Sequence, residues 1–230
     1  MRTVLLGERY RDVLELPLKA RGFLPYWLPE HPGLDQRLAG HADLMVFQSD
    51  DQLIVARHLA EDIHFVNFLT SASTQYQCAE EQKPVYPGDA SLCACRLGRY
   101  LIHNPRVTNP SILENLNKTL ISVRQGYARC MVCAVGADAI ITSDHGIAKA
   151  VKNVGIQMLE ITQGYITLEG FPYGFIGGSS FQYGRTVYFT GTLNAHPDCE
   201  RILTFISEQG YSADFLTNLP IFDIGSVIAI

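Results

Sequence analysis

The sequence predicts an α/β fold in which five pseudo-symmetric ββαβ units form a five-bladed propeller around a central pore. The order strand, turn, strand, helix, strand recurs at intervals of roughly 40 residues, a spacing typical of repeat architectures. In four of these units the hairpin precedes the helix, which a doubly wound parallel sheet does not require. The first unit has one leading strand, and the apolar segment 225–230 supplies the missing one. Because this pairing closes the ring and leaves no open edge, we expect residues 1–230 to form one domain.

Most elements follow from apolar runs with strand or helix periodicity that are bounded by turn residues. In the first unit we expect strand 3–6, helix 11–21 and strand 24–28, and in the second unit a hairpin of strands 43–48 and 52–56 followed by helix 59–69. In the third unit we expect a hairpin of strands 90–96 and 100–103, a helix that begins at Pro110 and strand 120–123. In the fifth unit we expect a hairpin of strands 179–182 and 186–190 and a helix near Pro197. Proline suits the first turn of a helix, and Gly210 suits the end of the last one. The segment 70–84 shows no readable pattern.

The fourth unit gives the clearest pattern. Strands are expected at 130–135 and 139–142, on either side of a tight turn. Asp144 is suited to cap a helix whose apolar residues share one face. Strand 157–161 then completes the unit.

Composition and charge exclude some classes of function. The net charge is −5, the isoelectric point is about 5.8, and no cluster of lysine and arginine occurs, which argues against a nucleic-acid partner. No apolar run reaches the ~20 residues of a membrane span, and the first residues do not form a signal peptide. Six cysteines without a secretory signal favour a cytoplasmic protein with reduced thiols. The oligomeric state stays open.

Several short motifs carry a resemblance to a known family. They are His41–Phe47, Tyr86–Asp89, Gln125–Cys130, Gly174–Gly178 and Asp223–Ser226. Together they resemble an uncharacterised bacterial family with the fold of the guanidine-modifying enzymes, the pentein fold. Its better-known relatives are dimethylarginine dimethylaminohydrolase, arginine deiminase and the amidinotransferases. The resemblance spans nearly the whole chain and implies the fold.

The resemblance also implies where catalytic residues would stand. These relatives use a cysteine nucleophile from the last blade, a histidine from the fourth, and carboxylates from earlier blades that hold the guanidinium. Here Ala128 stands at the histidine position and Gly225 at the cysteine position, so the catalytic pair is missing. Asp89 matches a substrate-contacting aspartate of the hydrolases, and either Asp43 or Asp50 supplies the second carboxylate. Two carboxylates suit a planar cation.

The cysteines offer a second candidate for chemistry. Cys130 and Cys133 form a CxxC, but on one strand they would face opposite sides and could not share a zinc ion. They are therefore interpreted as buried strand cysteines. Cys93 and Cys95 share a face, and Cys130 could approach Cys93 from the neighbouring blade as a relocated nucleophile. No metal or cofactor is expected.

Polar residues also follow strands at equivalent places in adjacent units. Asn104, Asp144 and Asn194 would converge on one mouth of a symmetric ring, with His145 beside them. The alternative is an Asp144 helix cap next to an exposed His145. His41 is either a site base or a residue that hydrogen-bonds at the start of a strand.

The glycine-rich run before residue 179 has two readings. Gly177 and Gly178 permit either close backbone packing or the approach of a ligand. The run leads into a strand and not into a helix, which argues against a phosphate cradle.

Two functions remain open. In the first, a small guanidino or amine-bearing metabolite enters a central acidic pore, where any catalysis would be hydrolase-like or amidinotransferase-like on a C–N bond. The catalytic candidates are Asp144, His145 and Cys130, and the substrate-binding candidates are His41, Asp43, Asp89, Asn104, Gly177, Gly178 and Asn194. In the second, the protein is a non-catalytic pentein that binds other proteins or assists assembly.

Overall fold

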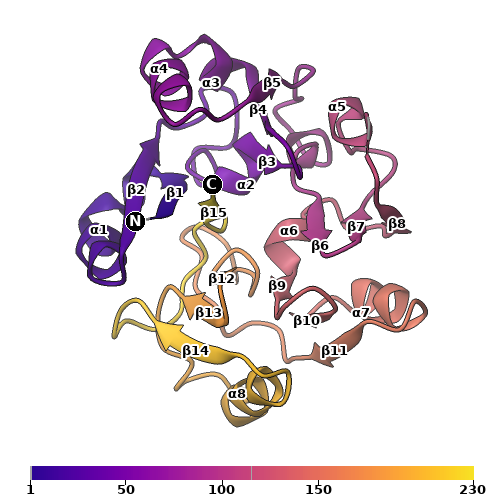
Figure 1. Ribbon diagram of the computed structural model, residues 1–230. Helices are drawn as coiled ribbons and strands as arrows, with labels where there is room; N and C mark the ends of the chain where they lie inside the picture. Colours follow the sequence, from indigo (N-terminus) through magenta and orange to yellow (C-terminus); the bar gives the residue numbers. More distant parts are fainter. Residues whose placement is uncertain (1, 115) are drawn as a thin grey trace.

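The computed structural model describes residues 2–114 and 116–230. Within them the strands form five three-stranded sheets, none of which is closed on itself. Figure 1 shows the sheets in chain order around the middle of the molecule, with the helices toward the outside. In every sheet one strand pairs antiparallel with a first neighbour and parallel with a second.

The first sheet joins segments from both ends of the chain. Strand β1 (Arg2–Gly7) runs through η1 (Glu8–Tyr10) and α1 (Arg11–Ala20) into the parallel strand β2 (Phe23–Leu28). On its other side β1 pairs antiparallel with β15 (Ile228–Ala229), as Figure 1 shows near the labelled C-terminus.

The other four sheets each contain a hairpin followed by a parallel return strand. Their strands are β3 (Val46–Gln48), β4 (Leu53–Val55) and β5 (Tyr76–Cys78); β6 (Cys95–Leu97), β7 (Tyr100–His103) and β8 (Thr119–Ser122); β9 (Cys133–Ala134), β10 (Ala139–Thr142) and β11 (Gln157–Glu160); and β12 (Ser180–Tyr183), β13 (Thr186–Phe189) and β14 (Ser212–Phe215). The helices between hairpin and return strand are α3 (Arg57–Glu61) and α4 (Ile63–Ser71), α5 (Pro110–Leu113), α7 (His145–Lys152) and α8 (Cys199–Glu208). The α/β composition and the unit order are thus as the sequence predicts.

The leading strands are shorter than predicted. Short helical turns take their place at α2 (Ala42–Met45), η2 (Gly88–Ala90) and α6 (Ala128–Met131), so the first parts of the expected strands 43–48, 90–96 and 130–135 are wrong. All four residues of α2 are buried. A short apolar run that is buried on every side has no periodicity that separates a strand from a helical turn.

Local signals placed other elements correctly and explain one break. Strands β7 and β10 have the predicted bounds, and the Asp144 side chain accepts the Ile147 backbone N–H at 2.8 Å as the cap of α7. The single helix predicted at 59–69 is two helices, because Asp62 adopts an extended backbone between them. Its carboxylate caps α4 by accepting the His64 N–H at 2.8 Å.

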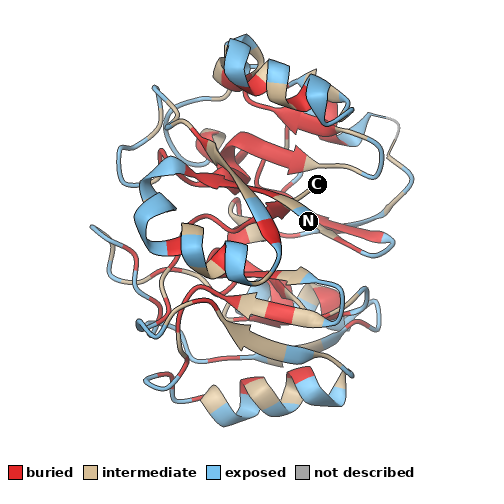
Figure 2. Cartoon of the chain, turned by 60° about the vertical axis from the view of Figure 1, so that its left-hand side comes forward, coloured by how far each residue is buried: buried red, intermediate tan, exposed pale blue. Residues whose placement is uncertain are grey.

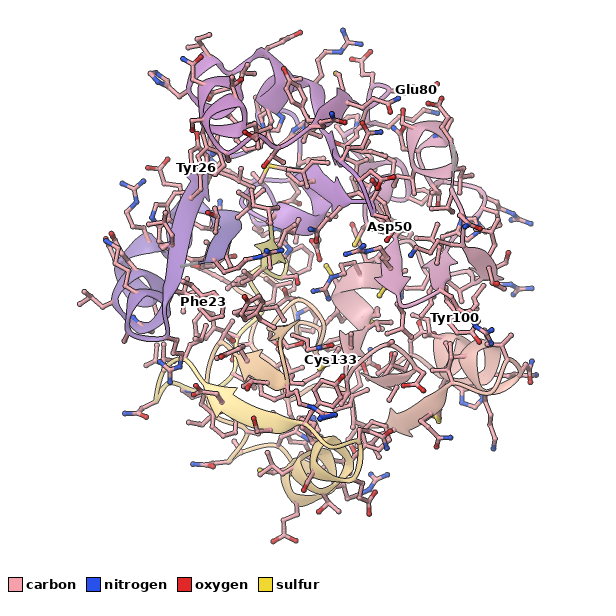
Figure 3. The ribbon with its side chains drawn as sticks, in the orientation of Figure 1. Phe23, Tyr26, Asp50, Glu80, Tyr100 and Cys133 are labelled. Atoms are coloured by element: carbon pink, nitrogen blue, oxygen red, sulfur yellow. The ribbon has the colours of Figure 1, made fainter. Side chains whose placement is uncertain are left out.

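The hydrophobic core lies between neighbouring sheets. Figure 2 shows the strands mostly buried and the helices with exposed outer faces. The Phe23 ring lies between the first and last sheets, 5.4 Å from the Phe181 ring and 5.2 Å from the Tyr188 ring, both edge-on (Figure 3). Such edge-on aromatic pairs stabilise beyond the area that they bury.

No helix among the described residues is both long and apolar enough to cross a membrane.

Candidate functional site

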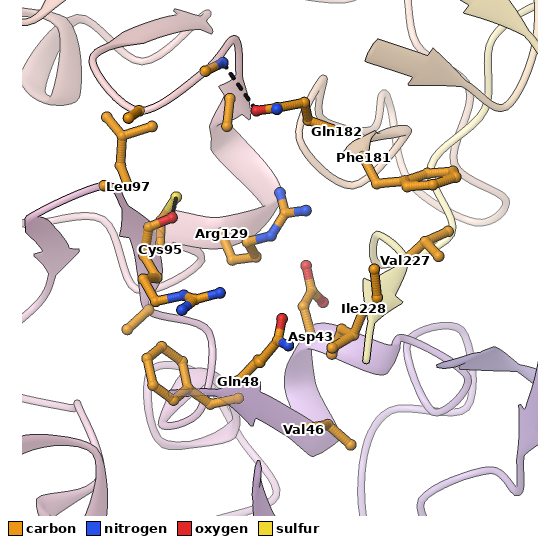
Figure 4. Close-up of a pocket in the computed structure, with 18 of the residues that line it drawn as sticks. Asp43, Val46, Gln48, Cys95, Leu97, Arg129, Phe181, Gln182, Val227 and Ile228 are labelled. Atoms are coloured by element: carbon orange, nitrogen blue, oxygen red, sulfur yellow. Dashed lines mark hydrogen bonds between the residues drawn. The ribbon is translucent and has the colours of Figure 1, made fainter. Parts of the chain in front are cut away.

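The leading strands of all five sheets line one cavity of about 460 Å³. Each sheet contributes at least one residue to this central cavity. The contributing residues include Gln48 of β3, Cys95 of β6, Ala134 of β9, Gln182 of β12 and Ile228 of β15. Because equivalent strands surround it, the cavity lies in the middle of the molecule (Figure 4).

The charged lining of the central cavity is mixed and not acidic. Among the described lining residues the charged ones are Asp43, Arg96 and Arg129. The Arg96 guanidinium is paired with Asp50 at 2.7 Å. Figure 4 shows the polar ends of Asp43, Gln48 and Arg129 pointing toward one another. The acidic pore expected from the sequence is therefore corrected to a pocket with one carboxylate and two guanidinium groups.

Asp43 is the buried carboxylate of this cavity. Its side chain is 1% exposed, and Oδ2 accepts the Cys130 thiol hydrogen bond at 2.8 Å. Its other oxygen, Oδ1, has no partner among the described residues. The pKa of Asp43 is raised to about 7, because burial and the neighbouring Asp223 carboxylate outweigh the opposing effects of the Cys130 hydrogen bond and of Arg129. A cation that enters the cavity would therefore favour the ionised carboxylate form of Asp43.

Three further side chains gather behind Asp43. A ring nitrogen of His41, a carboxylate oxygen of Asp43 and Cys130 Sγ all lie within 4.8 Å of one another. Cys93 Sγ lies 3.8 Å from Cys130 Sγ, which places these two cysteines together across neighbouring units. Burial raises the pKa of both thiols, so neither is an ionised nucleophile in this arrangement.

The segment before β15 closes over this group. Asp223 Oδ1 accepts the Gly225 N–H at 2.9 Å, Asp223 Oδ2 accepts the Phe175 N–H at 2.8 Å, and the Gly225 carbonyl accepts the Asp43 N–H at 3.0 Å. Gly225 has φ +69°, and a Cβ on it would overlap His41. The position that the resemblance assigns to a nucleophilic cysteine thus has no room for a side chain.

Asp89 lies next to the same group and, like Asp43, has a partner at Oδ2 but none at the buried Oδ1 among the described residues. The Tyr127 hydroxyl donates to Asp89 Oδ2 at 2.6 Å, and Asp89 is 5% exposed. Burial raises the pKa of Asp89, against the effect of this hydrogen bond. Ala128, at the position of the relatives' histidine, is fully buried.

The residues expected at a pore mouth are placed differently. Asp144 caps α7 and accepts a hydrogen bond from Gln125 at 3.2 Å, while the His145 side chain is 82% exposed and pairs with Glu160. Asn104 donates to the Arg124 carbonyl at 2.7 Å, and Asn194 is exposed. Asn104 and Asp144 therefore contact two residues that are adjacent in sequence, Arg124 and Gln125. Among the described residues, neither side chain has a hydrogen bond to Cys130.

The two glycines before residue 179 serve backbone packing. Gly178 N–H donates to the Cys130 carbonyl at 2.8 Å, and a Cβ on Gly177 would lie 2.7 Å from that same oxygen. A Cβ on Gly178 would overlap the Asp223 carboxylate. The absence of side chains lets this segment lie against α6.

Sequence reasoning missed Arg129 and Asp223 as parts of the site. Both stand inside motifs that carried the resemblance, next to Cys130 and two residues before Gly225. Their position in sequence, beside Cys130 and close to Gly225, was the only signal that could have indicated a role in the site.

The comparisons with known proteins identify a family and a fold. The model of a family described as a family of unknown function (DUF6873) matches residues 5–228. No curated protein matches the sequence. A dimethylarginine dimethylaminohydrolase mutant from Pseudomonas aeruginosa, complexed with citrulline, has a TM-score of 0.61 at 9% identity over 100% of this chain and 99% of that chain.

Two further solved structures show the same fold. An arginine dihydrolase from cyanobacteria has a TM-score of 0.61 at 11% identity and covers 93% of this chain and 36% of its own. An amidinotransferase from Microseira wollei has a TM-score of 0.57 at 11% identity over 94% of this chain and 88% of its own. The chain thus has the fold of the pentein enzymes, and at these identities the similarity shows the fold alone.

Proposed function

The chain belongs to this family of unknown function and has the pentein fold, and from that premise we propose that it binds a small guanidino or amine-bearing metabolite in the central cavity. In this proposal the five sheets are the blades of a single propeller domain, and the cavity is its pore. Asp43 holds the cationic group. One observation carries the proposal: Asp43 is a buried carboxylate in the cavity lining, and its Oδ1 has no partner.

An unpaired carboxylate oxygen in a buried position is costly, and a guanidinium or ammonium group supplies the missing donor. The central cavity has the size of a small-molecule site. Because Arg129 shares the lining with Asp43, a ligand that carries a carboxylate as well as a cation matches both charges. The ligand class is therefore a guanidino or amino acid.

The same geometry favours binding over the thiol chemistry of the relatives. Gly225 and Ala128 carry no catalytic side chain. Of the described lining residues, Cys95 is the only thiol, and burial raises its pKa to about 11. Cys130 does not line the central cavity, so its hydrogen bond with Asp43 does not present sulfur to a ligand there.

A thermal-shift and calorimetry screen tests the proposal. Arginine, citrulline, agmatine and a set of guanidino acids are added to wild-type protein, with norleucine as an uncharged-side-chain control. A ligand at 100 times its Kd stabilises the folded state by about 2.7 kcal/mol, which a thermal shift detects readily. We expect Asp43→Asn to abolish the shift.

Asp50→Asn is the matched control, because Asp50 is the other carboxylate considered for this role and lies in an exposed ion pair with Arg96 and Lys118. It should keep the full shift. If Asp43→Asn keeps the shift, the cation is held elsewhere. If none of the compounds binds the wild-type protein, the small-metabolite function is wrong and the protein-binding function gains support.

A further inference from the structure

Four side chains lie behind the central cavity, and three of them, His41, Asp43 and Cys130, bring possible ligand atoms within 4.8 Å of one another. The four are His41, Asp43, Cys93 and Cys130, named here the His41 cluster. They come from the segment before β3, the segment before β6, and α6. All four are at most 3% exposed, and no two of the three segments are adjacent in sequence.

Two distances within the His41 cluster, from Cys93 to Cys130 and from Cys130 to Asp43, can be compared with the distances between ligands of one zinc ion. Tetrahedral zinc with Zn–S bonds of about 2.3 Å holds two sulfur ligands about 3.8 Å apart. Cys93 Sγ and Cys130 Sγ lie 3.8 Å apart. The Cys130 Sγ to Asp43 Oδ2 distance is 2.8 Å, shorter than the ~3.5 Å between a sulfur and an oxygen ligand of the same ion. The carboxylate would therefore move back by roughly 0.7 Å as the metal replaces the thiol proton.

An unpartnered buried atom gives a second, independent observation. Among the described residues, His41 Nε2 is buried and makes no hydrogen bond. Buried polar atoms in proteins are nearly always paired, so an orphaned ring nitrogen within this cluster needs an explanation. An ion that these residues ligate would supply it.

The electrostatic surroundings also suit a divalent cation. Asp223 contributes a second buried carboxylate close to His41 and Asp43. Two thiolates and one carboxylate leave a zinc-loaded cluster with a net charge of −1, which the nearby Arg129 and Arg9 guanidinium groups balance. Two sulfur ligands with a nitrogen and an oxygen favour zinc over magnesium or calcium.

From this geometry we propose that the His41 cluster is a buried zinc site, in which His41, Asp43 and Cys130 are ligands and Cys93, 3.8 Å from Cys130, moves in as the fourth. The site is closed, as in structural zinc centres, and it links three units of the fold. The proposal goes beyond metabolite binding. Asp43 lines the central cavity, whereas His41, Cys93 and Cys130 are not among its described lining residues. The two proposals therefore share one residue and can fail separately.

Metal binding is measured first on the whole protein. Metal-free protein is prepared with a chelator under reducing conditions and titrated with zinc, and the bound metal is counted by elemental analysis. We expect one tightly bound zinc per chain and a higher Tm. Because both thiols must lose their protons, zinc binding in weak buffer should release about two protons per ion. A stoichiometry well below one zinc per chain would overturn the proposal.

Variants then locate the ion. Cys93→Ser, Cys130→Ser and His41→Gln should each weaken zinc binding at least tenfold. Cys95→Ser and Cys133→Ser are matched controls, because both remove a buried cysteine outside the cluster, and both should bind zinc like the wild type. Equal zinc binding by all five variants would overturn the assignment.

Two readouts on wild-type protein do not depend on whether a variant folds. Cobalt substitution should give thiolate charge-transfer absorption and the intense visible bands of a tetrahedral ion. Bound zinc should also protect Cys93 and Cys130, but not exposed Cys78, from alkylation as mapped by mass spectrometry. A cobalt spectrum without thiolate bands would rule out the two cysteines as ligands.

Discussion

His41 occupies the space that a side chain on Gly225 would need. An added Cβ would overlap the backbone and side chain of His41, and the Gly225 backbone has φ +69°, where residues with a side chain are strained. Gly225 is also the position that the sequence resemblance assigns to a nucleophilic cysteine. The position of His41 gives a steric reason why no side chain fits there.

Restoring the cysteine should therefore damage the fold and not create an enzyme. We expect Gly225→Cys to lower the free energy of unfolding by about 2–4 kcal/mol, because overlap and backbone strain add. Urea denaturation measures the loss, and an assay for citrulline or urea should detect no product. Gly155→Ala is the control: its φ is +81° but an added Cβ meets nothing within 4 Å, so only the strain of about 1 kcal/mol remains. Equal losses in the two variants would show that His41 exerts no steric effect.

The contribution of the hydrogen bond between Tyr127 and Asp89 to the free energy of unfolding should be measurable by substitution. Tyr127→Phe removes the donor at 2.6 Å and leaves a buried carboxylate with less support, so we expect a loss of about 1–3 kcal/mol. A double-mutant cycle with Asp89→Ala should give a coupling energy of at least ~0.5 kcal/mol. Tyr165→Phe, at a half-exposed position, should cost little. Strict additivity in the cycle would contradict the contact.

Asp223 should contribute far more to the free energy of unfolding than an exposed ion pair does. Asp223→Ala leaves the buried Phe175 and Gly225 N–H groups without acceptors, and we expect a loss of about 2–4 kcal/mol. Hydrogen exchange at those two amides should accelerate more than elsewhere in the core. Asp214→Ala, which breaks a partly exposed pair with Arg21, should cost at most ~1 kcal/mol. Unchanged exchange at Phe175 and Gly225 would contradict the anchoring role.

The His31 and His58 rings predict a dependence of stability on pH. Their centroids are 4.4 Å apart, and both ring nitrogens of His58 are buried without a partner among the described residues. The pKa of His58 is lowered to about 4, because burial and the neighbouring His31 outweigh the opposing effect of the Asp62 carboxylate. The folded state thus keeps His58 neutral, while the unfolded chain takes up a proton below about pH 6.5.

The contribution of His58 to stability should therefore be full above pH 6.5 and fall as the pH drops toward 4, by on the order of 1–2 kcal/mol after solvent screening. Urea titrations of wild type and His58→Phe at several pH values measure this contribution as the difference between the two proteins. His64→Phe, at an exposed position, should follow the wild type. A difference between wild type and His58→Phe that grows in the opposite direction would disprove the assignment.

The repeat was readable from sequence because hairpins and helix caps are encoded locally. Strand β10 and the Asp144 cap followed from apolar runs and one capping residue. The helical turn α6 did not, because its buried residues carry no distinguishing period. The convergence of Asn104, Asp144 and Asn194 on one mouth, expected from their equivalent places in the repeat, stays a prediction.

The candidate site was readable only in part. The sequence predicted that Cys130 could approach Cys93 from the neighbouring unit, and their sulfur atoms lie 3.8 Å apart, although neither residue lies on the strand that was expected. The contact between Asp43 and Cys130 spans 87 positions of sequence, and no local pattern specifies such a pairing. Only the packing of whole units against one another brings these residues together.

The pairing of β1 with β15 sets an order of events during synthesis. Residues of β1 leave the ribosome before those of β15, which follow all the other strands that the structure describes. Until β15 is synthesised, one edge of β1 is unpaired, and Val4 and Leu5 lack their strand partners on that side. The first sheet is therefore the last to be completed, and a chain halted before residue 228 exposes a strand edge that can recruit a foreign strand.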